Sequence, residues 1–200
     1  MNAGHTSERV YDALKERLLS GSVPPGERLE PAAYADALGS SATPVRDALH
    51  RLAGEHLVEM RLAEGFFLPR VTESGLRSLY LWNLEIVRIA LRQGRRGTST
   101  HPPARPDQDH AATARALFSR IAVVSGNSEI VRAIDAANDR LATARIAESH
   151  ILPQDRQDLG ALQSALRQDD RTSAARQILL YHRIRIGVVP QIVQALHGLS

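Results

Sequence analysis

Residues 35–54, ADALGSSATPVRDALHRLAG, decide the fold of the N-terminal part of this 200-residue chain. Gly39 ends one expected helix, and a turn of about three or four residues leads to another that begins at Thr43-Pro44. Thr43 is expected to cap this second helix, and Pro44 suits its first turn. Apolar residues at helical spacing form its buried stripe: Val45, Leu49 and Leu52. Two helices joined by so short a turn predict a helix-turn-helix.

The flanking segments extend this pattern on both sides. Upstream, an apolar stripe through Val10 and Leu18 predicts a helix that Gly21 ends, followed by a short extended stretch around residues 28–30. Pro31 suits the first position of the helix that Gly39 ends. Downstream, two β-prone runs, LVEMR and FFLPR, flank the hairpin signal LAEG at residues 62–65. This order of elements predicts a winged helix-turn-helix.

The N-terminal end of the third expected helix is the candidate DNA-contact site. Its unpaired backbone N–H groups and positive partial charge suit contact with phosphate. Ser41, Thr43 and Arg46 lie there, on the side away from the buried stripe. An arginine one turn into such a helix reaches guanine edges in a major groove.

Two further positions are expected to contact DNA. Arg51 and the hairpin tip at Gly65 suit contacts to the DNA backbone or the minor groove. Arg51 could instead pair with Asp47, four residues earlier on the same helix. In the hairpin, one ring of Phe66-Phe67 is expected to pack on the core rather than stack on bases.

Composition excludes several classes of protein. Cysteine is absent, which rules out disulfides, thiolate zinc sites and cysteine nucleophiles. No stretch of 18 apolar residues predicts a membrane span, and no secretory signal is evident, so we expect a cytoplasmic protein without a membrane partner. Residues 1–70 hold 8 Lys and Arg against 10 Asp and Glu, so bulk charge does not argue for nucleic acid.

The remainder of the chain predicts helices. Residues 94–108 hold three prolines and two glycines and are expected to form an exposed, mobile loop that includes Arg95 and Arg96. Around it we expect about six helices in an antiparallel bundle, with caps at Thr72, at Asp107 or Asp109, and at Asp170. One of them is a long helix that Ser128 opens and that runs through Leu141 and Ile146.

The N-terminal pattern resembles the DNA-binding domain of the GntR family of bacterial transcription regulators. The resemblance covers about residues 8–70 and rests on four motifs: VYDAL at 10–14, PGERL at 25–29, ADALG at 35–39 and SATPVRDALHRL at 41–52, with Gly65-Phe66 in the wing. The remainder is similar to the all-helical effector domain of the FadR-like branch, through Phe118, the turn at 125–127, and Asp170 with Ala174. Two departures are Ala42, where the family often has arginine, and the alanines at 32 and 33.

The resemblance implies a homodimer on a two-fold symmetric double-stranded DNA operator, with a small acidic metabolite altering affinity. It also implies a winged helix-turn-helix over residues 1–70 and an effector-binding and dimerisation domain over 71–200. Many relatives hold a divalent metal on the helices, at positions that correspond here to Arg115, Ser119, Leu159 and Tyr181. None is a good metal ligand, so we expect neither a metal nor another cofactor.

One hypothesis for the effector site is that Arg115 replaces the cation, with Ser119 and Tyr181 as hydrogen-bonding neighbours. His182 lies next to Tyr181 and joins this candidate set. The alternative is that Arg115 is solvated and the helices pack with apolar side chains alone. No catalytic motif points to an enzyme. The competing class is a helical enzyme or ligand-binding protein whose winged domain makes protein contacts.

Overall fold

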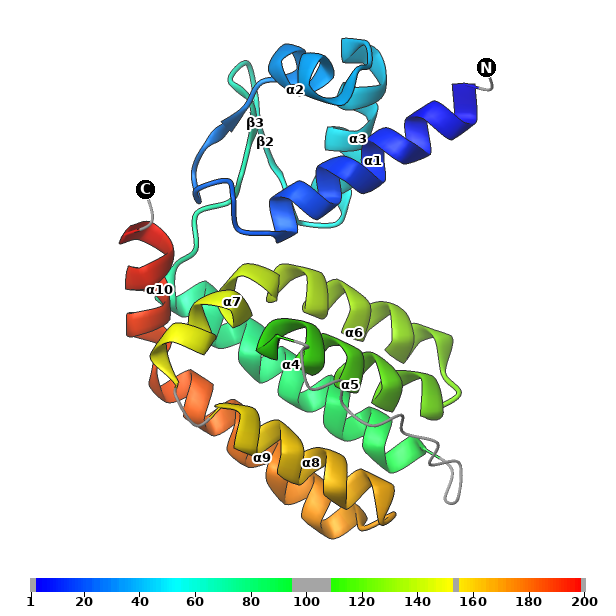
Figure 1. Cartoon of the computed structure of the whole chain (residues 1–200), viewed down its shortest axis with the longest axis vertical. Helices are drawn as coiled ribbons and strands as arrows, with labels where there is room; N and C mark the ends of the chain where they lie inside the picture. The colour runs from blue at the N-terminus through cyan, green and yellow to red at the C-terminus, as the bar shows by residue number, and fades with distance from the viewer. Residues whose placement is uncertain (1–2, 95–108, 153–154, 199–200) are drawn as a thin grey trace. The chain divides into compact units, whose positions relative to one another are not determined.

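The computed structural model describes residues 3–94, 109–152 and 155–198, so the expected loop, with Arg95, Arg96 and Asp107, lies outside the described residues. The chain divides into two compact units, Met1–Val71 with Leu196–Ser200, and Thr72–Ala195. Figure 1 shows helices and a small sheet in the first unit and helices in the second. In the described part of the chain, no helix is both long and apolar enough to span a bilayer.

The first unit is a winged helix-turn-helix, as the sequence predicts. Its elements follow in the expected order: α1 (Ala3–Leu19), β1 (Arg28–Leu29), α2 (Pro31–Leu38), α3 (Ala42–Gly54), β2 (Glu59–Arg61) and β3 (Gly65–Phe67). The three strands form an antiparallel sheet with β3 in the centre. Leu29 and Met60 both lie opposite Phe66, whose ring is buried. The expectation that one ring of this pair packs on the core is therefore confirmed.

The helix-turn-helix corner depends on a glycine. Gly39 ends α2 with φ 58° and ψ 46°, a left-handed conformation that costs glycine little. The next residue, Ser40, donates its N–H to the carbonyl of Ala35 at 2.9 Å. Ser41, in extended conformation, is the N-cap residue of α3. The prediction that Thr43 caps this helix is thus wrong: α3 begins one residue earlier, and Thr43 lies inside its first turn.

Buried apolar residues of α1 and α3 form the core of this unit. Val10 and Leu14 of α1 and Val45, Leu49 and Leu52 of α3 are fully excluded from solvent. The sheet adds Leu29 and Phe66 to the same cluster. Burying each such side chain contributes about 1.5–3 kcal/mol, so this core holds α3 in one rotational setting.

The second unit consists of helices, seven of them among the described residues: α4 (Glu73–Gln93), α5 (His110–Val124), α6 (Ser128–Arg140), α7 (Ala142–Ile151), α8 (Asp155–Arg167), α9 (Arg171–Gly187) and α10 (Val189–Gly198). The last residues of α10, from Leu196 on, are counted with the first unit. The expected caps at Thr72, Asp109 and Asp170 are confirmed, since each side chain accepts an N–H of the first turn. The N-terminal end of α4 meets the C-terminal end of α9, where Arg77 donates to the carbonyl of Ile186 at 3.3 Å.

The single long helix expected from Ser128 through Ile146 is instead two helices, α6 and α7. The break falls at Leu141, whose φ of −91° and ψ of −1° depart from helical geometry. Leu141 is fully buried, which anchors the break in the core. The apolar spacing of a helix continues across this residue, so the periodicity alone did not reveal the change of direction.

The packing of α3 yields a stability prediction. Leu49→Ala removes a fully buried side chain, and we expect it to lower the free energy of unfolding of the N-terminal unit by about 2–5 kcal/mol. Urea unfolding of the full chain, followed by circular dichroism, measures the change. Leu62→Ala is the matched control because Leu62, in the wing, is 95% exposed, and we expect an effect within about 0.5 kcal/mol. Equal effects of the two variants would contradict this core.

Candidate DNA interface and buried ligand site

The N-terminal end of α3 presents the predicted DNA-contact residues to solvent. Ser41, Thr43 and Arg46 are all exposed. The hydroxyl of Ser41 makes no capping hydrogen bond, and no acidic residue lies in the first turn of α3. The positive end of the helix therefore stays unneutralised, which suits an anion such as a phosphate.

Arg46 extends from this end of α3 without an internal partner. Within the described residues, the structure gives it neither a hydrogen bond nor an ion pair. Val45 and Leu49, its neighbours in the helix, are buried, so Arg46 lies on the outward face. Its five N–H donors are therefore available to an external acceptor.

Arg51, in contrast, is paired with other side chains of its own domain at the surface. Its Nη1 lies 3.1 Å from a carboxylate oxygen of Glu8, and its Nε lies 3.6 Å from Oε1 of Glu55. Its guanidinium stacks on the ring of Tyr11, 3.6 Å from the centroid. These partners, rather than the Asp47 that the sequence suggested, tie α3 to α1. DNA contact by Arg51 stays a prediction, and it would compete with two carboxylates.

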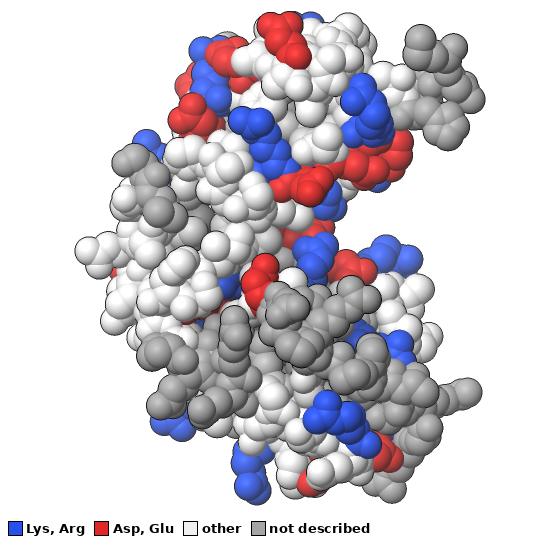
Figure 2. Space-filling view, in the orientation of Figure 1, with Lys and Arg blue, Asp and Glu red and all other residues white. Residues whose placement is uncertain are grey.

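The wing ends in a tight turn. Gly65 has φ 101°, a conformation that L side chains rarely adopt, and the turn before it exposes Leu62 almost completely. Arg61 stacks on the ring of Phe67 at 4.1 Å, and His50 of α3 packs edge-on to Phe66. The wing is thus fixed to α3 at its base. Figure 2 shows Lys and Arg interspersed with Asp and Glu on the visible face of the unit, without a patch of one sign.

In the second unit, a buried carboxylate organises a polar cluster. Glu148 of α7 accepts a hydrogen bond from Tyr80 of α4 and another from Nε of Arg185 of α9, at 2.8 Å. Nε2 of His110 lies 3.2 Å from the same carboxylate, and Asp158 lies 3.6 Å from Arg185. Burial raises the pKa of Glu148, but the hydrogen bond of His110 and the charge of Arg185 outweigh it and hold the pKa below its usual value.

A second buried group surrounds the ring of Phe118 on α5. Arg145 of α7 donates from Nη1 to the side-chain oxygen of Asn138 at 2.8 Å, and its guanidinium lies 5.3 Å from the Phe118 ring centre. Tyr181 packs edge-on against the same ring at 5.2 Å, with His182 at 5.7 Å. All five side chains are almost fully excluded from solvent.

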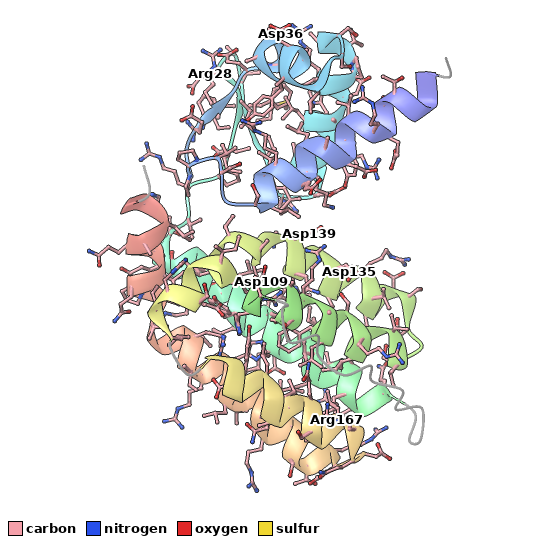
Figure 3. The ribbon with its side chains drawn as sticks, viewed as in Figure 1. Arg28, Asp36, Asp109, Asp135, Asp139 and Arg167 are labelled. Atoms are coloured by element: carbon pink, nitrogen blue, oxygen red, sulfur yellow. The ribbon has the colours of Figure 1, made fainter. Side chains whose placement is uncertain are left out.

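The four predicted effector residues fall into two places. Arg115 makes an ion pair with Asp139 of α6, and Ser119 donates to Asp135 at 2.8 Å. Figure 3 labels the two aspartates, Asp135 and Asp139. Asn138 donates to Ser119 at 3.0 Å, which connects this pair of helices to Arg145. Tyr181 and His182 lie in the Phe118 group instead. The side chain of Arg115 is 43% exposed, so it is partly solvated as well as paired, and another anion would compete with Asp139 for it. Its role at an effector site stays a prediction.

Sequence reasoning missed Arg145, Glu148 and Arg185, which are fully buried. The sequence did contain a signal for Arg145 and Glu148. On α7 the buried positions Leu141, Ala144 and Ala147 define an inward face, and Arg145 and Glu148 fall on it. Charged residues in an inward stripe are rare unless they are paired or functional.

The metal site of the resembling branch does not fit these residues. Leu159 is buried and has no donor, Arg115 is ion-paired, and the guanidinium of Arg185 lies against both His110 and Glu148. Across residues 3–94, 109–152 and 155–198, no group of three or more His, Asp or Glu side chains is arranged to hold a metal ion.

These features define a winged-helix protein with an all-helical second unit. The family model for bacterial regulatory proteins of the gntR family matches residues 6–68. The match falls on the winged domain, so the resemblance given by its motifs is confirmed for these residues.

Curated relatives match the same part of the chain. The HTH-type transcriptional regulator McbR of Escherichia coli (strain K12) is 35% identical over 85 residues, which are 42% of this chain and 38% of McbR. The HTH-type transcriptional regulator YdhC of Bacillus subtilis (strain 168) is 26% identical over 83 residues, 42% of this chain and 37% of YdhC. The match thus spans about two fifths of these relatives.

Solved structures match nearly the whole chain. E. coli McbR/YncC has a TM-score of 0.68 at 21% identity, covering 96% of this chain and 99% of that one. A GntR transcriptional regulator from Rhodococcus sp. RHA1 has a TM-score of 0.70 at 19% identity, covering 94% of this chain and 98% of that one. At these identities the match shows a shared fold.

His182 generates a prediction on pH. Burial lowers its pKa to about 4, while Nδ1 lies 2.7 Å from the carbonyl of Ile178 and Nε2 lies 2.9 Å from the side-chain oxygen of Asn83. An unfolded histidine binds its proton near pH 6.5, so between about pH 6.5 and 4 the unfolded state holds the extra proton. The free energy of unfolding should fall by about 1.4 kcal/mol per pH unit in this window as pH decreases.

His182→Gln tests this because glutamine does not titrate. Urea unfolding, followed by the fluorescence of Trp82 on α4, reports on the second unit, since Trp82 is the single tryptophan. We expect the variant to lose most of the pH slope between 6.5 and 4, whatever its stability at pH 8. A slope equal to that of the wild type would mean that His182 titrates in the folded protein as it does in the unfolded one.

Proposed function

We propose that this protein is a DNA-binding transcription regulator whose second unit binds a small-molecule effector. The observation that carries the proposal is the exposed, unneutralised N-terminal end of α3, where Ser41, Thr43 and Arg46 face solvent. The gntR-family match to this domain and the regulators among its relatives support it. Such a role places the protein in the cytoplasm.

The DNA contact follows from the geometry of α3. The helix end and the hydroxyls of Ser41 and Thr43 bind phosphates, which position the domain, while Arg46 reads a base edge in the major groove. The wing tip near Gly65 contacts the backbone or the minor groove. One domain of this size covers one half-site, so we infer a homodimer on a two-fold symmetric operator.

The second unit supplies the response to a ligand. We infer an effector site in the manner of the FadR-like branch, with a small anion bound between helices. The effector acts by population shift: it binds better to one spacing of the two winged domains, and that spacing matches or mismatches the operator half-sites.

Arg46→Ala tests the proposal. On an operator selected from fragments of the source genome, we expect a loss of about 1–3 kcal/mol in binding free energy and relaxed selectivity at one base position. Fluorescence anisotropy on the cognate duplex and on single-base variants measures both. Wild-type affinity should also fall steeply with salt, because binding to phosphates releases counterions.

Arg88→Ala is the matched control. It removes the same charge from an exposed arginine on α4 that pairs with Glu85 at 2.9 Å, and we expect unchanged DNA affinity. Equal losses of DNA affinity in the two variants would mean that the effect of Arg46→Ala comes from the change in net charge alone. If Arg46→Ala binds the operator with the affinity and selectivity of the wild type, then Arg46 does not have the role assigned to it.

A further inference from the structure

The turn of the wing presents apolar side chains to solvent. Leu62 is 95% exposed, the highest value among the large apolar side chains of the described residues. Met60 is 58% exposed, and Ala63 is exposed as well. Single apolar residues are ordinary at a surface, but here three of the four residues 60–63 are apolar and exposed. The tip of this hairpin therefore offers an apolar contact.

The backbone holds Leu62 in place. Glu64 donates its N–H to the carbonyl of Arg61 at 3.1 Å, which closes the turn. Ala63 has φ 63°, a left-handed conformation that costs an alanine free energy, and Gly65 follows with φ 101°. Because the turn is already ordered, a partner that covers Leu62 does not have to pay for ordering it.

The wing lacks the charge that contact with phosphates would need. Its hairpin, residues 59–67, holds one basic residue and two acidic ones. The basic residue, Arg61, is paired: its Nε lies 2.9 Å from Glu59 and its Nη1 lies 4.0 Å from Glu64. Such a wing gains little from the charge of a DNA backbone. Its contact with DNA is therefore expected to be apolar.

The tip lies at the end of the sheet where α2 begins. β1 and β3 are antiparallel, with Arg28 opposite Phe67 and Leu29 opposite Phe66. The step from Leu29 toward α2 therefore runs in the same direction as the step from Phe66 back to Gly65 and the tip. Figure 1 shows the hairpin turn, α2 and the start of α3 at one end of the unit. A duplex on the N-terminal end of α3 is thus within reach of the wing.

We propose that Leu62 inserts its side chain between two base pairs from the minor groove and kinks the operator. An apolar wedge of this kind unstacks one base step, and the bent duplex then contacts more of the protein. Pyrimidine–purine steps such as TA unstack most readily, so Leu62 selects a flexible step where the wing meets each half-site. The inference rests on the proposed function, because it needs α3 on a duplex.

DNA bending tests the wedge. A duplex that carries the selected operator and a dye at each end reports a kink as increased energy transfer on binding. We expect the wild type to bend this duplex, and Leu62→Ala to bend it much less and to bind about tenfold more weakly, because the contact of a buried leucine is lost. The salt dependence of affinity should stay that of the wild type, since Leu62 neutralises no phosphate. A wild-type bend in saturated Leu62→Ala overturns the inference.

Two further variants separate a wedge from other contacts. A lysine would strengthen a wing that lies along the phosphates, whereas we expect Leu62→Lys to lose the bend. Tighter binding by Leu62→Lys with an unchanged bend would contradict the wedge. Leu179→Ala is the matched control, because it removes a leucine that is 51% exposed on α9, and it should retain the bend. Equal losses of bending in Leu62→Ala and Leu179→Ala would also contradict it.

The base step itself supplies an internal control. Duplexes in which one step at a time is changed from TA to AA locate the kink, because AA is the stiffer step. We expect the wild type to prefer TA at one position in each half-site, and Leu62→Ala to bind both duplexes equally there. An equal preference for TA in the two proteins would mean that another residue bends the DNA.

The competing occupant of the tip is a second copy of the chain. Analytical ultracentrifugation without DNA should give Leu62→Ala the mass of the wild type, and a lower mass would place Leu62 in a protein contact and overturn the wedge. Failure of the proposed function is distinguishable, since the wild type would then select no operator. A wild type that needs Arg46 for its operator but does not bend it would retain the regulator and exclude the wedge.

Discussion

The burial of one face of α3 is the constraint on which the candidate interface depends. Val45 and Leu49 are fully excluded from solvent, and they fix the rotation of the helix about its own axis. Because residues one position apart on a helix point in different directions, this setting places Thr43 and Arg46 outward. The exposed groups of the DNA-contact surface are therefore determined by side chains that never meet DNA. A less tightly packed core would let α3 rotate about its axis, and this would change which side chains face outward before the domain unfolds.

The two units differ in where their paired arginines lie: at the surface in the N-terminal unit and in the core in the second. In the N-terminal unit, Arg51 pairs with Glu8 and Glu55 at the surface, where ion pairs contribute little to stability, while Arg46 is left without an internal partner. In the second unit, Arg185 is neutralised in the core by Glu148, and Arg145 is not.

The winged domain could be predicted from the sequence because its signals are local. Gly39 permits a left-handed residue, Pro31 starts a helix, and apolar spacing identifies the buried stripe of α3. The error at the cap of α3 arose because Ser41 and Thr43 are both good capping residues and only the backbone conformation decides between them. The break at Leu141 was missed for a related reason, since apolar periodicity continues across it.

The buried polar groups of the second unit could be predicted only in part, because their members meet across helices. Tyr181 and His182 were identified through a resemblance, yet the charge beside them belongs to Arg145 on another helix. Sequence alone does not say that Asp139 lies opposite Arg115 and satisfies it. How α5, α6 and α7 pack against one another decides which arginine has a carboxylate partner. Asn138 of α6 is central to that packing, because it connects Arg145 of α7 to Ser119 of α5. A change in any one of these three side chains therefore acts on three helices at once.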